Sequence, residues 1–191
     1  MDEELRSLTE RLRQESRGSA AYEHLVATAD HEELAEALTA AGQPLWAREL
    51  AAFRLGTAGD RRAFEALVLL LNHRDPPRCA SAAQALARLR DPRTARAAAA
   101  LATNELRVAH ALHPVRLLVE LRAPESVPAL ITTLERRLRP HDPYRRVALA
   151  CVDGLGALGD PSARRVLNEA LAHPALAEAA VHALARIPKQ R

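Results

Sequence analysis

The stretch that decides the fold is Leu155-Gly156-Ala157-Leu158-Gly159-Asp160-Pro161. Its first part is typical of the end of a helix, because Gly159 can adopt the left-handed conformation that terminates one. Its last part is typical of a helix start. The Asp160 carboxylate can accept hydrogen bonds from the free N–H groups of the next turn, and Pro161 needs no partner at the first helical position. The stretch therefore predicts two helices joined by a bend with an aspartate.

The same junction recurs along the chain. Copies with an aspartate at the bend lie at Asp30, Asp60 and Asp91, and degenerate copies have Ala123 and Lys189 in that place. The steps between successive junctions are 30, 31, 32, 37 and 29 residues. Self-similarity at such a period indicates a repeat architecture in which each unit is a pair of helices.

The apolar residues after each junction repeat in register. Seven residues beyond the four best-aligned junctions the chain has Leu67, Ala98, Leu130 and Leu167. These positions belong to one face of a helix. A single helix pair cannot bury such a face, whereas stacked pairs bury a continuous core. We therefore expect these four side chains to lie in the protein interior.

Three stretches together resemble a known repeat family. They are the junction at 155–161, Arg145-Arg146-Val147-Ala148-Leu149 before it, and Ala80-Ser81-Ala82-Ala83-Gln84-Ala85-Leu86 before Asp91-Pro92. The family is the HEAT-like repeats of the short bacterial type, first noted in phycocyanobilin lyase subunits. The resemblance covers about residues 19–189 and implies an all-α, right-handed α-α superhelix, a HEAT-like solenoid. It specifies a fold and is nearly silent on function.

We expect two parts in the chain: an N-terminal capping helix in residues 1–18 and a repeat array in residues 19–191. The expected helices cover 2–16, a weak pair within 20–41, then 44–56 with 61–72, 77–90 with 92–103, 105–122 with 125–138, 143–158 with 161–172, and 175–187. The segment 136–143 lengthens one connection, and its prolines predict a loop. Such an insertion suits a binding face, and tolerated loop growth explains it equally well.

Composition narrows the class of protein. The 191 residues are 48% apolar but only 3% aromatic, with abundant alanine and leucine, which favours helices over strands. No stretch approaches 18 consecutive apolar residues, so we expect no transmembrane helix. The acidic start, Met1-Asp2-Glu3-Glu4, is unlike a signal peptide, and we expect a reducing cytoplasm. Of 27 basic residues 26 are arginine, which indicates a GC-rich bacterial genome.

The sequence offers no constellation typical of catalysis or metal binding. His110 and His113 have the spacing of two metal ligands, but zinc needs three or four, and no cysteine or carboxylate lies at a matching position. Cys79 and Cys151 are flanked by small apolar residues, so we expect buried, inert thiols. Asp153, in an apolar helix, either bonds to a neighbouring helix or faces solvent. We expect no catalytic residue, metal or cofactor, and the sequence leaves open whether the chain is an enzyme subunit.

The second helix of each pair is where we expect a partner to bind. In HEAT-like arrays these helices usually line the concave face. The strip predicted there comprises Val68, Leu69, Ala99 and Ile131, with a cationic margin of Arg62, Arg93, Arg96 and Arg165. Arginine beside apolar surface is typical of protein interfaces. Packing against neighbouring repeats is the alternative role for the apolar residues.

Charge is distributed unevenly along the chain. Residues 1–41 hold four arginines and ten acidic residues, a net charge of −6, and residues 42–191 hold 23 basic and 14 acidic residues, a net charge of +9. Such asymmetry can steer a partner, and solvated helix faces of uneven sign are the alternative. We expect a non-catalytic scaffold or adaptor that binds a protein or peptide with acidic groups.

Two other functions stay open. Nucleic-acid binding would use the arginine pairs at 61–62, 136–137, 145–146 and 164–165. The scarcity of aromatic residues for stacking and the interspersed glutamates count against it. A lyase-type chaperone or enzyme subunit is the third possibility, suggested by the resemblance. The sequence names neither the partner nor the oligomeric state.

Overall fold

The computed structural model of the chain describes residues 3–188, and these residues form helices and turns with no strand among them. Contacts divide the chain into two compact units, the first ending at Thr94 and the second beginning at Ala95. Each unit is described by itself. Within the described residues, no helix is both long enough and apolar enough to cross a bilayer.

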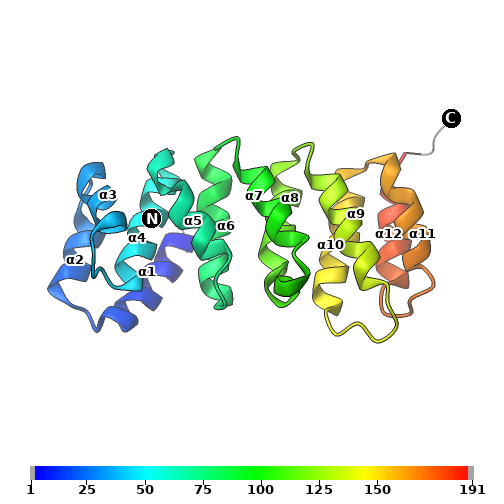
Figure 1. The fold of residues 1–191 in the computed structure, drawn as a ribbon, viewed down its shortest axis with the longest axis horizontal. Helices are drawn as coiled ribbons and strands as arrows, with labels where there is room; N and C mark the ends of the chain where they lie inside the picture. The colour runs from blue at the N-terminus through cyan, green and yellow to red at the C-terminus, as the bar shows by residue number, and fades with distance from the viewer. Residues whose placement is uncertain (1–2, 189–191) are drawn as a thin grey trace. The chain divides into compact units, whose positions relative to one another are not determined.

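The first unit is built around one central helix. Its elements are α1 (Glu3–Ser16), α2 (Ala20–Ala27), α3 (His31–Thr39), α4 (Leu45–Thr57), the 3-10 turn η1 (Arg61–Ala63), α5 (Phe64–Leu71) and α6 (Pro76–Leu89). Helix α4 contacts α1, α2, α3, α5 and α6. Figure 1 shows these helices in blue to green, with α4 among them.

The second unit is organised in the same way around α10. Its elements are α7 (Thr94–Ala102, within the unit from residue 95), η2 (Glu105–His110), α8 (Leu112–Leu121), α9 (Ser126–Arg137), α10 (Arg145–Leu158), η3 (Pro161–Ala163), α11 (Arg164–Ala170) and α12 (Ala177–Arg186). Helix α10 contacts α8, α9 and α12.

The predicted aspartates cap the helices that follow them. At Asp30, Asp60, Asp91 and Asp160 the carboxylate accepts the backbone N–H two residues later, at 2.8, 3.0, 2.9 and 2.8 Å. Each bond satisfies a donor that the first helical turn leaves free. At the junction that has Ala123 in place of aspartate, the Ser126 hydroxyl accepts the backbone N–H of Ala123 at 3.1 Å and donates to the Leu118 carbonyl at 2.6 Å. The bend is therefore held by hydrogen bonds even where the aspartate is missing.

The residue before the junction has a left-handed backbone in four copies. Gly59 and Gly159 have φ of 82° and 72°, as predicted, and Arg90 and Arg122 have φ of 51° and 48°. A residue with a Cβ pays about 1 kcal/mol for this conformation. The geometry of the bend therefore outweighs local preference at the two arginines.

Arginines also cap the carbonyl ends of helices from other pairs. Their guanidinium groups donate to backbone carbonyls that helix ends leave free. The bonds run from Arg54 to Leu25 at 2.8 Å, Arg122 to Ala157 at 3.1 Å, Arg136 to Thr103 at 2.5 Å, and Arg164 to Ile187 at 3.0 Å. Each bond joins residues that are 23 to 35 positions apart.

The predicted core positions are buried. Leu67 in the first unit and Ala98, Leu130 and Leu167 in the second have no exposed surface. Both cysteines are free and buried, as predicted. Burial raises the pKa of the Cys151 thiol, because the thiolate would lose its hydration.

The prediction of one helix over 105–122 is wrong. The segment is a 3-10 stretch, η2, followed by the shorter α8, and Arg107 lies outside the helical region with φ −125° and ψ 15°. A continuous α-helix would drive the ring of Pro114 into the carbonyl of His110, four residues earlier. In the structure Pro114 instead lies in the first turn of α8, where proline is tolerated.

The predicted loop at 136–143 begins later than expected. Helix α9 ends at Arg137, which confirms the predicted helix over 125–138 to within one residue at each end; the overlapping loop prediction is wrong for residues 136 and 137. The Arg137 side chain is buried, forms an ion pair with Asp142 at 3.0 Å, and lies 5.7 Å from the centre of the Tyr144 ring. These contacts fasten the loop to the end of α9.

The capping aspartates make stability depend on pH. The hydrogen bond from the Arg93 side chain holds the pKa of the buried Asp91 below its ordinary value. Stability from such a group is present above its unfolded pKa of about 3.9 and is lost as pH falls through the lower, folded pKa. We expect Asp91→Asn to lower the urea midpoint at pH 7, and the gap to the unchanged protein to close as pH falls below about 4.

The matched control for this prediction is Asp30→Asn. Asp30 caps its helix in the same way, but the second residue after it is Glu32, so no arginine pairs with it there. The difference in urea midpoint between Asp30→Asn and the unchanged protein should be smaller at pH 7 and vary less with pH. A gap for Asp91→Asn that stays constant from pH 7 to acid would contradict the prediction.

Candidate partner-binding surfaces

The predicted apolar strip falls into the two units. In the first unit Leu69 on α5 has 73% of its surface exposed, and Val68 beside it is half-buried. In the second unit Ala99 on α7 and Ile131 on α9 are both half-buried. The use of these residues by a partner stays a prediction.

Arginines of the predicted margin bind carboxylates of the repeats. Arg62 contacts Asp60 at 2.7 Å and Glu32, in the preceding repeat, at 2.8 Å. Arg165 forms ion pairs with Glu135, thirty residues earlier, and with Glu169 on its own helix. Hydrogen bonds to these carboxylates raise the pKa of Arg62 and Arg165. Both cations are therefore partly neutralised within the chain.

The other two margin arginines differ from each other. Arg93 contacts Asp91 at 3.0 Å and Glu65 at 3.1 Å, and its guanidinium lies 3.9 Å from the centre of the Phe64 ring. Arg96 is exposed and has no ion pair within residues 5–188. Three of the four predicted cations thus already have acidic partners.

A groove in the second unit was not predicted. It has a volume of about 480 Å³ and lies on α8 and α10, with the end of α12 at its edge. Its aliphatic lining comprises Leu112, Val119, Leu149, Ala150 and Ala157. Its charged lining comprises Arg116, Arg146, Asp153 and Arg186. These are first helices of their pairs, not the second helices on which a surface was predicted.

The charged groups of the groove are available to a ligand. Among the described residues, none of Arg116, Arg146, Arg186 and Asp153 forms an ion pair or a side-chain hydrogen bond. Burial lowers the pKa of His113, next to the groove on α8, and the charges of Arg116 and Arg146 lower it further. The ionisable lining of the groove is thus three arginines and one aspartate.

Ion pairs between neighbouring repeats follow the repeat period. Five arginines bind a glutamate that lies 28 to 31 residues earlier, one repeat back: Arg62 with Glu32, Arg78 with Glu49, Arg93 with Glu65, Arg136 with Glu105, and Arg165 with Glu135. Arg116, Arg146 and Arg186 have no acidic residue at that distance before them. The period thus shows where such a pair can form, but it does not identify every unpaired arginine, since Arg96 follows Glu65 by 31 residues.

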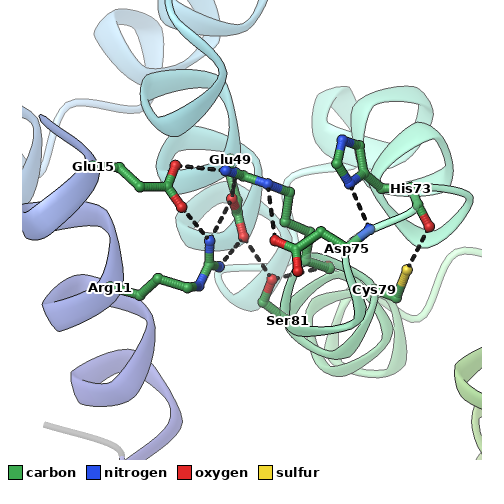
Figure 2. Close-up of polar contacts among 8 residues, drawn as sticks. Arg11, Glu15, Glu49, His73, Asp75, Cys79 and Ser81 are labelled. Atoms are coloured by element: carbon green, nitrogen blue, oxygen red, sulfur yellow. Dashed lines mark hydrogen bonds and ion pairs between the residues drawn. The ribbon is translucent and has the colours of Figure 1, made fainter.

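A second polar cluster lies in the first unit, where α1 meets α4 and α6 (Figure 2). Its centre is the Glu49 side chain, which is 1% exposed and accepts hydrogen bonds from Arg11, Arg78 and Ser81. Glu15 on α1 closes the network by contacting Arg11 at 3.0 Å and Arg78 at 2.5 Å. The partners are up to 63 residues apart, so helix periodicity could not identify the cluster.

The start of α6 is fixed beside this cluster. His73 Nδ1 accepts the backbone N–H of Asp75 at 3.0 Å, and the Cys79 thiol donates to the His73 carbonyl at 3.0 Å (Figure 2). The Asp75 carboxylate contacts Arg78 at 3.3 Å. In the part of the chain that the structure describes, no three histidine, cysteine, aspartate or glutamate side chains converge as a metal ion would require.

Comparison with known families identifies one repeat. Residues 147–173, from α10 through the Asp160 junction to just beyond α11, match the family described as PBS lyase HEAT-like repeat. This segment is similar to the repeats of that family. The predicted all-α, HEAT-like repeat fold is confirmed, and the right-handed superhelix stays a prediction. None of the curated proteins compared with the chain is similar to it in sequence.

The HEAT-like repeat contributes directly to the groove. It contains the groove residues Leu149, Ala150, Asp153 and Ala157. A helical repeat scaffold presents side chains from successive helices on one surface, and here α8 and α10 do so side by side. The groove is thus a product of the repeat architecture.

Proposed function

We propose that the chain is a non-catalytic adaptor that binds a protein or peptide partner carrying acidic groups, in the groove on α8, α10 and α12. The observation that carries the proposal is the set of three arginines, Arg116, Arg146 and Arg186, that line this groove without an acidic partner among the described residues. Other arginines of the repeats have such partners.

The chemistry of the groove specifies the kind of segment that it fits. A guanidinium offers paired donors that match the two oxygens of a carboxylate. The aliphatic side chains between the arginines can cover apolar groups of the same segment. Asp153 provides one acceptor for a basic group or an N–H donor. The partner is therefore a short segment in which carboxylates alternate with apolar residues.

The nucleic-acid alternative is less favoured. In the arginine pairs that suggested it, Arg62, Arg136, Arg137 and Arg164 already contact carboxylates or backbone carbonyls. Fewer cations than the net charge suggests are therefore available to phosphates. A lyase-type chaperone role rests on the family description alone, and no feature of the groove favours it.

The test is affinity capture with the tagged full chain from its native cells, quantified by mass spectrometry. The variant Arg116→Glu with Arg146→Glu should reduce recovery of the partner at least about tenfold, because both cations would repel its carboxylates. The matched control is Arg139→Glu with Arg145→Glu. Both of these residues are exposed, lie outside the groove and carry the same change of charge.

The same assay separates the groove from the other surfaces. If Leu69→Asp with Ile131→Asp abolishes capture and the groove variant does not, the predicted strip is the binding surface and the groove proposal is wrong. Retention of duplex DNA by the purified chain at salt concentrations of about 50 to 200 mM would favour the nucleic-acid alternative. Equal loss of the partner in the groove variant and in its control would mean that only net charge matters.

A further inference from the structure

The groove of the second unit has a counterpart in the first. Residues 69 positions apart are equivalent in α6 and α10, because their helix pairs bend at Asp91 and Asp160. Four residues of α6 line the seam that this helix forms with α1, and four residues of α10 line the groove. They are equivalent one by one: Pro77 with Arg146, Ala80 with Leu149, Ser81 with Ala150, and Gln84 with Asp153. The same positions of a first helix thus form a hollow surface in each unit.

In the first unit this surface holds a helix. Helix α1 lies against α4 and α6, with Leu8 and Leu12 buried and with Arg11 and Glu15 directed at charged partners (Figure 2). From this internal example we infer that the groove on α8, α10 and α12 binds an amphipathic α-helix of the partner protein. The inference rests on the proposed function and adds the conformation of the segment that is bound.

Equivalent helices form the receiving surface in each unit. Helix α4 packs on α6 in the first unit, and α8 packs on α10 in the second. Eleven positions before the bend, α4 has Glu49, α8 has Leu112 and α10 has Leu149. Glu49 is buried under α1, whereas the two leucines are half-buried and line the groove. The surface that α1 covers in the first unit is therefore open in the second.

The side chains at these equivalent positions define the partner helix. Arg11 of α1 is paired with Glu49, in whose place α8 and α10 have Leu112 and Leu149. A leucine at the place of Arg11 would bury apolar surface against them, whereas an arginine there would lose hydration without gaining a carboxylate. The partner helix therefore presents leucine where α1 presents arginine. Helix α1 of a second copy is for this reason a poor occupant.

Charge complementarity defines the rest of that helix. Glu15 of α1 contacts Arg78 at 2.5 Å, and Arg146 lies one position before the equivalent of Arg78 on α10. A carboxylate at the place of Glu15 would therefore lie close to a guanidinium in the groove. Arg116 offers a second guanidinium on α8. The groove thus fits a helix whose apolar face is flanked by carboxylates.

The length of the groove suits a short helix. Its lining on α10 extends from Arg146 to Ala157, which is about 17 Å along the helix axis. Helix α1, with 14 residues, is about 21 Å long. A segment of this length is marginally helical in water when isolated. The groove would therefore order the partner segment as it binds.

The probe is a fluorescent peptide with the sequence of residues 3–16 and the change Arg11→Leu, which keeps Glu15 for Arg146. Its binding to the full chain is measured by anisotropy. We expect it to bind at least about tenfold more tightly than the peptide without the change, because a leucine replaces an unpaired arginine. Carbon-13 NMR of the labelled peptide should show Cα shifts typical of a helix when the full chain is added.

A charge exchange tests the register. Adding Glu15→Arg to the peptide should weaken binding at least about fivefold, because two guanidinium groups would then lie close together. The chain variant Arg146→Glu should restore the binding of this peptide. The matched control is Arg145→Glu, an exposed neighbour outside the groove, which should not restore it. Equal restoration by both variants would overturn the inference.

A scrambled peptide separates this inference from the proposed function. It has the composition of the Arg11→Leu peptide, but its leucines no longer share one face of a helix. If both peptides bind equally and both are lost in Arg116→Glu with Arg146→Glu, the groove binds acidic segments without selecting a helix, and only this inference is wrong. No binding of either peptide, or equally tight binding of the unchanged 3–16 sequence, would also overturn it. The capture assay then tests the adaptor function independently.

Discussion

Replacement of Glu49 by glutamine is expected to lower the free energy of unfolding of the chain by about 3 kcal/mol, since removal of one partner from a buried ion pair leaves the other charge uncompensated. Glu49 is 1% exposed and binds Arg11, Arg78 and Ser81 (Figure 2). Glutamine keeps the shape but removes the charge that both guanidinium groups face. Urea unfolding followed by circular dichroism measures the change.

The control is the same substitution at an exposed ion pair. Glu65→Gln removes a carboxylate that is 78% exposed and contacts Arg93 at 3.1 Å. An exposed pair contributes at most about 1 kcal/mol, so this variant should unfold close to the unchanged protein. Equal and small effects of the two substitutions would show that the cluster around Glu49 does not stabilise the first unit.

Replacement of Gly156 by alanine is expected to destabilise the second unit by about 2 kcal/mol, even though alanine is the better helix former by about 1 kcal/mol. A Cβ at this position would lie 2.7 Å from the Cα of Ala183 and 2.8 Å from its Cβ. The obstacle is the backbone of α12, which cannot rotate away as a side chain does. Helices α10 and α12 would have to separate, as urea unfolding should show.

Two further variants test that explanation. Gly154→Ala, on the same helix, meets the Cγ2 methyl of Val119, a side-chain atom at the open groove and not a backbone atom, so its effect should be smaller. Ala183→Gly in the Gly156→Ala background removes the overlap with the methyl group of Ala183 but leaves the overlap with its backbone, and should restore part of the lost stability. An equal loss of stability from Gly154→Ala and Gly156→Ala would contradict the explanation by a backbone clash.

The fold was predictable because its signals are local. Asp60 and Asp160 mark the starts of helices because their side chains cap the first turn. Leu67 and Leu167 lie at equivalent positions after them and are buried. The break before α8 was missed although Pro114 marks it, because the period of apolar residues was read without the clash that proline creates. Arg90 and Arg122 could not be recognised as left-handed, since that conformation is imposed by the surrounding bend.

The candidate site was much less predictable. An exposed arginine is useful to a partner only if no carboxylate of the chain neutralises it, and this depends on helices one repeat away. Arg62 and Arg165 looked available in the sequence but are paired, whereas Arg116 and Arg146 are the unpaired ones. Glutamates one period earlier could have indicated the difference. In the buried cluster, Glu49 and Arg78 have the same spacing of one repeat, but Arg11 and Glu15 gave no periodic signal, because α1 lies outside the repeat pattern.

The arginines that donate to helix-end carbonyls limit how repeats can be added to or removed from such a chain. Arg54 and Arg164 each satisfy a carbonyl in a different hairpin, at Leu25 and Ile187. Duplication or deletion of one hairpin would separate the guanidinium donor from the carbonyl acceptor and leave both without a hydrogen-bond partner. The hairpins are therefore not interchangeable. An engineered change in the number of repeats would also require new residues in place of the arginines at the point of insertion or deletion.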